Sequence, residues 1–148
     1  MKKAVKKRAK RKGVPIPDGM TVRRSSAGLG MFATRPYKKG EFVIEYVGRV
    51  ISKKEEETSR SKYLFEVTKN KTIDGKPSIN PAGYLNHSCH PNCEADVKKG
   101  RVLITAIKHV RAGDELTWDY GKEYVGEHIA PYGCRCVKHR PELHRVRK

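Results

Sequence analysis

Long apolar segments are missing from this 148-residue sequence, and acidic residues are scarce. No apolar run approaches the roughly 20 residues that a membrane-spanning helix needs, so the sequence predicts neither a membrane segment nor a membrane partner. The N-terminus is basic, but no apolar stretch follows it, and nothing there predicts a secretion signal. We therefore expect an intracellular protein of the cytoplasm, nucleoid or nucleus, or one exported without a cleaved signal.

The shortage of acids is uneven along the chain. The sequence holds 16 Asp and Glu against 33 Lys and Arg, which gives a formal net charge of +17. Eight of the basic residues fall within residues 2–12, where no acid occurs; the rest of the chain carries +9, which is 17 less 8. Residues 1–19 are predicted to form a flexible basic tail. Such a tail is either a solvated arm, a contact for nucleic acid or chromatin, or a localisation address.

Helical periodicity is also scarce, whereas short β patterns recur. β-branched and aromatic residues predict strands at residues 42–47, 63–67, 95–98 and 101–107. Lys99 and Gly100 between the last two predict a hairpin turn. One short surface helix is expected over residues 53–60, because Ser52 and Glu55 have the spacing of a capping box. The fold class is therefore mainly β, with many short strands and few short helices.

Only four cysteines occur, in two pairs: Cys89 with Cys93, and Cys134 with Cys136. In a reducing compartment, clustered thiols favour a metal site over a disulfide. The two thiols of the C-x-C pair are too close in sequence to bridge easily to each other, but this spacing suits metal ligands.

Four motifs stand out by their order and spacing. They are G-L-G at residues 28–30, N-H-S-C-H-P-N at 86–92, E-L-T-W-D-Y-G at 115–121 and C-R-C at 134–136. Alone, the first predicts only a glycine-flanked turn, and the third could be an edge strand. The G-x-G motif lacks the third glycine and the βαβ unit of a dinucleotide site.

Together the motifs resemble the SET-domain family of protein lysine methyltransferases, from about residue 20 to residue 136. The resemblance implies a SET domain over residues 20–122 and a basic post-SET-like tail over residues 123–148. It also implies a C-terminal pseudoknot, in which residues 115–120 pass through a loop near residues 86–92. Side-chain amides of Asn86 and Asn92 would hold this crossing, a reading that we weigh equally with ligand binding.

The implied cofactor is S-adenosyl-L-methionine. By resemblance, the backbone of Ala27, Gly28 and Leu29 would contact it and Tyr63 would pack on it. Asn86 and His87 would hold its amino-acid and adenine ends. A core histidine fixed by its neighbours is the alternative for His87.

The implied reaction is methyl transfer to a lysine ε-amine of a protein. Tyr120 is the expected catalytic residue, because its hydroxyl would orient the amine; the alternative is a buried tyrosine bonded to backbone. Tyr46 is expected to support catalysis or to line the channel. Trp118 stands where the family often carries Phe or Tyr and would line the substrate channel with Tyr120. A large ring there predicts mono- or dimethylation, unless Trp118 merely fills the core.

The resemblance also suggests a zinc site, but one that departs from the family pattern. The usual post-SET tail provides C-x-C-x4-C, and Pro141 occupies the last position here. Cys89, Cys134 and Cys136 could still bind one Zn²⁺. The fourth ligand could be His139, His144, Cys93 or water, with His139 preferred; a metal-free tail is the alternative.

The expected substrate is a protein lysine, with histones or histone-like DNA-binding proteins as the family's usual targets. A rival function is a catalytically inactive SET-like module that binds chromatin or nucleic acid through its basic arm. Tyr120, Asn86 and His87 argue against a loss of catalysis. A small zinc-binding protein associated with ribosomes or nucleic acid would leave residues 115–121 unexplained. The oligomeric state has no signature in the sequence.

Overall fold

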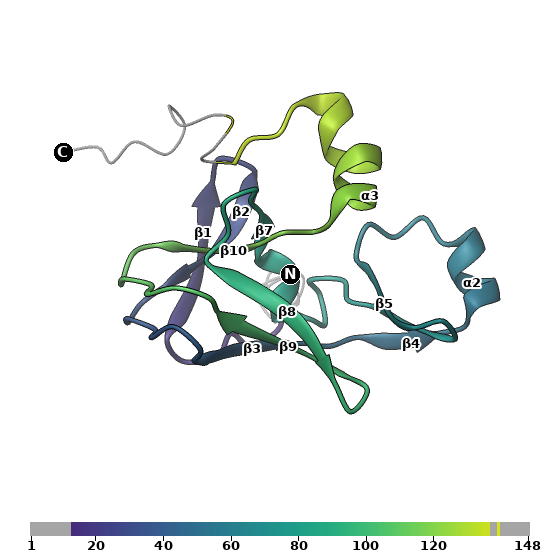
Figure 1. Ribbon diagram of the computed structural model, residues 1–148, viewed down its shortest axis with the longest axis horizontal. Coiled ribbons are helices and arrows are strands. Elements are labelled where there is room, and N and C mark those ends of the chain that lie inside the picture. The colour runs from purple at the N-terminus through teal and green to yellow at the C-terminus, as the bar shows by residue number, and fades with distance from the viewer. Residues whose placement is uncertain (1–12, 137–138, 140–148) are drawn as a thin grey trace, which may run out of the picture.

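The computed structural model describes residues 13–136 and residue 139. Strands dominate this part of the chain and form small separate sheets, joined by long loops and a few short helices (Figure 1). The prediction of a mainly β fold is therefore confirmed. No helix in the described part is long and apolar enough to cross a membrane.

The first sheet has the strand order β1 (Met20–Ser25), β2 (Gly28–Ala33), β10 (Glu115–Trp118) and β7 (Asn86–His87). β10 pairs antiparallel with β2 and parallel with β7. Residues 115–118 are thus paired on both sides, and the alternative of an edge strand is wrong. Two of the motifs, far apart in sequence, become neighbouring strands here.

The turn expected at residues 28–30 is displaced. Ser25 pairs with Gly28 at the end of the β1–β2 hairpin, so the chain reverses at Ser26 and Ala27 and the G-L-G motif belongs to β2. Gly28 has φ +96°, a conformation that side chains disfavour. The prediction failed because Gly28 is the first residue after the turn and not one of the two residues that form it.

The second sheet has the order β3 (Phe42–Tyr46), β9 (Arg101–Ala106) and β8 (Cys93–Lys98). β8 and β9 form the predicted hairpin. Its two turn residues both have positive φ, 51° at Lys99 and 77° at Gly100, as tight two-residue hairpins require.

The third sheet has the order β4 (Arg49–Ile51), β6 (Lys71–Asp74) and β5 (Leu64–Thr68), with helix α2 (Lys53–Thr58) beside it. The Ser52 side chain accepts a hydrogen bond from the Glu55 backbone N–H at 3.1 Å, which confirms the predicted N-cap. The helix ends two residues before residue 60, because Ser59 is already extended.

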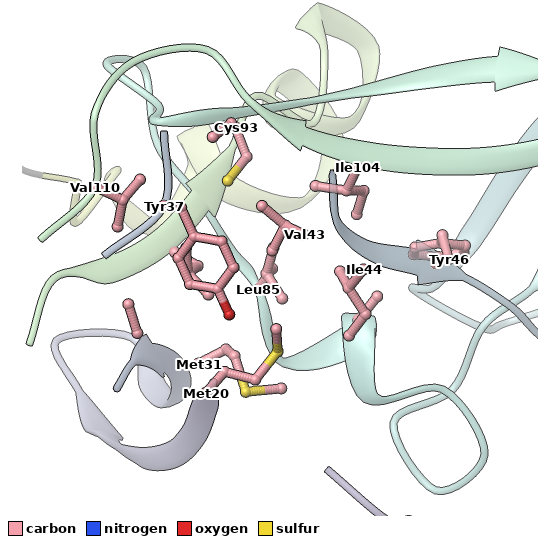
Figure 2. Packing of buried hydrophobic residues seen from close by; sticks show 14 of the residues in the cluster. Met20, Met31, Tyr37, Val43, Ile44, Tyr46, Leu85, Cys93, Ile104 and Val110 are labelled. Carbon is pink, nitrogen blue, oxygen red and sulfur yellow. The ribbon is translucent and has the colours of Figure 1, made fainter. Parts of the chain in front are cut away.

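The core lies where the first two sheets meet the short helix η1 (Pro81–Tyr84). Figure 2 shows Cys93 among these buried side chains, near Tyr37, Val43 and Val110. The Cys93 side chain is fully buried, and burial raises its pKa to about 12. Cys93 is therefore a core residue, and the alternative that it supplies the fourth metal ligand is wrong.

Asn92 holds β10 against the loop that follows β7. Its side-chain amide donates to the Glu115 carbonyl at 2.8 Å, and its side-chain oxygen accepts from the Thr117 N–H at 2.9 Å. One side chain thus replaces two backbone partners along the edge of β10. This is the arrangement expected for an asparagine that fixes a chain crossing.

The chain after β10 is helical, which the sequence did not predict. It runs through α3 (Lys122–Tyr124), η2 (Val125–Ile129) and η3 (Ala130–Tyr132). None of these elements buries a residue fully. The segment holds Gly126 and, next to its last residue, Pro131, so it carries little helical signal.

Candidate active site

A cavity of about 700 Å³ opens between the β1–β2 turn, β7 and the C-terminal helical segment. Its walls include most of the residues predicted to bind a cofactor, namely Ala27, Leu29, Tyr63, Asn86 and His87. Gly28 is not part of the wall, although it lies between two residues that are. The volume lies within the usual range for small-molecule sites.

Asn86 connects the floor of this first cavity to three elements. Its side-chain amide donates to the Leu29 carbonyl at 3.0 Å and to the Glu115 carboxylate at 2.9 Å, and lies 3.2 Å from the Ser25 hydroxyl. A Cβ on Gly30 would lie 2.4 Å from that carboxylate. The second glycine of the G-L-G motif therefore makes room for this network.

His87 is fixed on both ring nitrogens. Nδ1 accepts a hydrogen bond from the Tyr120 backbone N–H at 3.0 Å, and Nε2 lies 3.3 Å from the Cys89 sulfur. The side chain is 4% exposed. Burial lowers the pKa of His87, although Asp119 at 3.6 Å acts in the opposite direction. His87 thus has the contacts of the core histidine weighed above and also faces the first cavity.

A second cavity, of about 570 Å³, has an aromatic inner wall. Trp118 packs at its centre, with ring centroids 4.9 Å from Tyr120, 5.8 Å from Phe65 and 6.1 Å from Tyr46. Such a wall suits a long alkyl chain and disfavours a hydrated charge.

The hydroxyls of Tyr46 and Tyr120 both donate to backbone carbonyls in this wall. Tyr46 Oη lies 2.6 Å from the Tyr63 carbonyl, and Tyr120 Oη lies 2.5 Å from the Leu85 carbonyl. Burial raises the pKa of both hydroxyls. Each tyrosine is therefore a fixed, protonated group whose oxygen still has a free lone pair.

The two cavities share part of their walls. Both are lined by Lys62, Tyr63, Gly83, Tyr120, Tyr124 and His128. Tyr120 stands between them and contacts Tyr124, with ring centroids 5.0 Å apart. A group in one cavity could therefore reach a group in the other beside the Tyr120 ring.

Trp118 has one unsatisfied polar atom. Among the described residues, its indole Nε1 is the buried side-chain nitrogen or oxygen that lacks a hydrogen-bond partner. A buried unpaired donor costs about 1–3 kcal/mol unless something else accepts its hydrogen bond.

Cys89, Cys134, Cys136 and His139 form a cluster of metal-ligand type. One donor atom from each lies within 4.8 Å of all the others. Burial raises the pKa of Cys89 and Cys134. Burial also acts on Cys136, but hydrogen bonds from the Cys89 backbone and from His139 hold the Cys136 pKa well below its ordinary value.

This donor set fits zinc in type and number. Three sulfurs and one imidazole nitrogen are a usual tetrahedral zinc set, and a thiolate already favoured at neutral pH eases binding. His139 occupies the position predicted for the fourth ligand, 3.4 Å from the Cys136 sulfur. His144, the other histidine considered, lies outside the described residues.

Sequence reasoning missed several wall residues, mainly on the helical segment. Tyr124 and His128 line both cavities, and their rings are 4.6 Å apart. Tyr120, Tyr124 and His128 are spaced four residues apart, which is the one signal that could have placed them together on a helix.

Comparisons with known proteins agree with these motifs. A model of the SET domain matches residues 28–121. Human histone-lysine N-methyltransferase 2D is 33% identical over 126 residues, which cover 73% of this chain and 2% of that protein. Mouse histone-lysine N-methyltransferase NSD3 is 36% identical over 126 residues, which cover 74% of this chain and 8% of that protein. The mouse H3 lysine-36 specific enzyme is 34% identical over 133 residues, covering 81% and 5%. The chain thus spans less than a tenth of the length of these relatives.

Proposed function

Since this chain belongs to the SET-domain family, we propose that it is a protein-lysine N-methyltransferase that uses S-adenosyl-L-methionine. The observation that carries the proposal is the junction of the two cavities at Tyr120. A cofactor in the first cavity and a lysine side chain in the second would meet there. Methyl transfer needs this approach from opposite sides, and few other reactions do.

The first cavity suits the cofactor. The backbone of Ala27 and Leu29 and the side chain of Asn86 offer polar groups to the amino-acid end of the cofactor. The Tyr63 ring could stack on its flat base. Gly28 keeps the turn in a conformation that leaves this backbone accessible. When bound, S-adenosyl-L-methionine would supply an electrophilic methyl group.

The second cavity suits the lysine. An exposed lysine has a pKa near 10.4, so only about one amine in 2,500 is neutral at pH 7. Entry into the aromatic wall of Tyr46, Phe65 and Trp118 strips water from the ammonium and favours its neutral form. Desolvation and alignment of the amine therefore account for most of the rate acceleration proposed for this site.

Tyr120 aligns the amine. Its hydroxyl already donates to the Leu85 carbonyl, so the remaining lone pair can accept a hydrogen bond from the ε-amine. The raised pKa keeps this hydroxyl protonated, so Tyr120 acts as an orienting group and not as a base. Tyr46, bonded to Tyr63, supports the same wall.

We also propose that Cys89, Cys134, Cys136 and His139 bind one zinc ion of structural type. All four coordination positions are filled by protein, which leaves none for catalysis. The ion would fix the C-terminal segment, on which Tyr124 stands, to the loop after β7.

The substrate class is a protein lysine, and histones or histone-like DNA-binding proteins are the targets we infer. The three relatives compared above are all named as histone-lysine methyltransferases. Residues 2–12 lie outside the described part, but their eight basic residues would suit contact with chromatin or nucleic acid. We accordingly place the protein inside the cell, in the nucleus or nucleoid.

Tyr120→Phe tests the proposal. The full chain is incubated with methyl-labelled S-adenosyl-L-methionine and either core histones or cell extract. We expect transfer by the wild type and a loss of about 10²-fold or more in kcat for Tyr120→Phe, comparable to the loss of one preorganised catalytic hydrogen bond. Lys69→Gln, at an exposed position that lines neither cavity, is the control and should keep full activity. Absent transfer, or equal transfer in Tyr120→Phe, would favour an inactive binding module.

A further inference from the structure

Two loops at one end of the molecule carry an unusual concentration of positive charge. Lys38 and Lys39 lie in the connection between β2 and β3, and Lys108, His109 and Arg111 lie in the connection between β9 and β10. All five side chains are exposed. We call the three lysines and Arg111 the cationic surface. In Figure 1 the β9–β10 connection reaches the left edge, opposite α2 at the right.

The backbone of the cationic surface is fixed. Tyr37 and Val110 exchange two backbone hydrogen bonds of 2.9 Å each, and the Gly40 N–H donates to the Ala106 carbonyl at 2.7 Å. Tyr37 and Val110 are almost fully buried beneath the loops. The like charges are therefore held side by side by the fold, and their mutual repulsion has to be offset elsewhere.

Acidic residues of the same loops do not neutralise this surface. Glu41 forms an ion pair with Arg35 at 2.9 Å and accepts from the Lys38 backbone N–H. Asp114 accepts from the Arg111 backbone N–H at 2.8 Å. Within the described residues, none of these four cationic side chains forms an ion pair.

The turn before β1 lies beside this surface, because the Gly19 carbonyl accepts hydrogen bonds from the Tyr37 hydroxyl at 2.8 Å and from the Thr34 N–H at 2.9 Å.

We propose that the cationic surface binds the phosphate backbone of duplex nucleic acid. Regularly spaced phosphates match a rigid array of unpaired cations. A protein partner would need an apolar centre to the interface, and a single strand would need exposed rings for stacking. Phe42, which directly follows the first loop and is 51% exposed, is one exposed ring, and a single ring supplies neither the apolar centre of a protein interface nor a row of stacking sites. This inference concerns binding alone and does not depend on the proposed methyl transfer.

The test compares two triple variants of the full chain with equal net charge. Lys38→Gln, Lys39→Gln and Arg111→Gln remove charge from the cationic surface. Lys108 and His109 stay unchanged because they also line the first cavity.

The control variant carries Arg60→Gln, Lys69→Gln and Lys98→Gln, at exposed positions on the elements around the second and third sheets. Thermal unfolding verifies that both variants fold. Binding to a fluorescent duplex of about 20 base pairs is measured by anisotropy between about 50 and 200 mM salt.

Each lost phosphate contact reduces the magnitude of the slope of log K against log salt by about 0.9. The slope of the surface variant should therefore be shallower than that of the wild type by up to about 2.7. Its affinity should fall at least tenfold at the lower salt, whereas the control should stay within about twofold of the wild type. Equal losses in both variants, or none in the surface variant, would overturn the proposal. Equally tight binding to a single strand or to polyglutamate at the same salt would do so as well.

Discussion

Replacement of Asn92 by alanine should destabilise the whole fold, because one side chain holds the crossing of β10. The substitution leaves the Thr117 N–H without an acceptor and the Glu115 carbonyl without a donor. An unsatisfied buried group costs about 1–3 kcal/mol, and water reaches the partly buried site to some extent. We therefore expect a loss of about 2–4 kcal/mol, a large share of the roughly 5–15 kcal/mol that stabilises a domain.

Urea unfolding of the full chain, followed by tryptophan fluorescence, measures this loss. Trp118 lies next to Thr117, so the probe reports on the crossing itself. Asn70→Ala is the control, since Asn70 is exposed in the β5–β6 turn, and it should change stability by less than about 0.5 kcal/mol. A loss below about 1 kcal/mol for Asn92→Ala, with an unchanged m-value, would show that β10 does not depend on this asparagine.

Three further changes test other parts of the site. Because the pKa of His87 is lowered in the folded protein, the unfolded chain takes up a proton at a higher pH than the folded chain does. The free energy of unfolding should therefore fall as pH drops below about 6.5, and it should fall less in His87→Gln. Equal urea midpoints at about pH 7.5 and 5.5 in both proteins would contradict this. Trp118→Phe should shift the mass spectrum of the product toward higher methylation, whereas a wild type that yields mainly trimethyl-lysine would refute the proposed limit. Elemental analysis should find about one zinc per chain, and Cys134→Ser should lose it and bind cofactor more weakly; a wild-type content near zero would exclude the metal.

The strands and the hairpins were largely predictable, because local chemistry determines them. Lys99 and Gly100 form the predicted tight turn, and Ser52 caps the predicted helix. The turn at Ser26 and Ala27 was not predictable in the same way. Serine favours turns only weakly, and the position of this turn follows from the pairing of β1 with β2 and from the Ser25 hydroxyl, which accepts from the Ala27 N–H at 3.2 Å.

The functional motifs were predictable as a set, but the direction of each side chain was not. Nothing in sequence separates Cys89 from Cys93, four residues apart. The structure turns Cys93 into the core and Cys89 toward the C-terminal cysteines. The difference arises because Cys93 begins β8 and pairs with Ala106, which faces the core. Such a choice depends on tertiary pairing, which a single sequence does not display.

The helical segment after β10 connects the proposed metal site to the proposed catalytic junction. It buries no residue fully, so its own packing cannot hold it in place. At one end the Tyr120 N–H is bonded to His87, and at the other Cys134 and Cys136 meet Cys89. His87 and Cys89 lie two residues apart, so both ends are tied to the same loop. Closing a loop in this way restricts the chain between the ties, and that chain carries the Tyr124 wall of both cavities. A metal ion that takes no part in the transfer would thus still govern whether the junction at Tyr120 is complete.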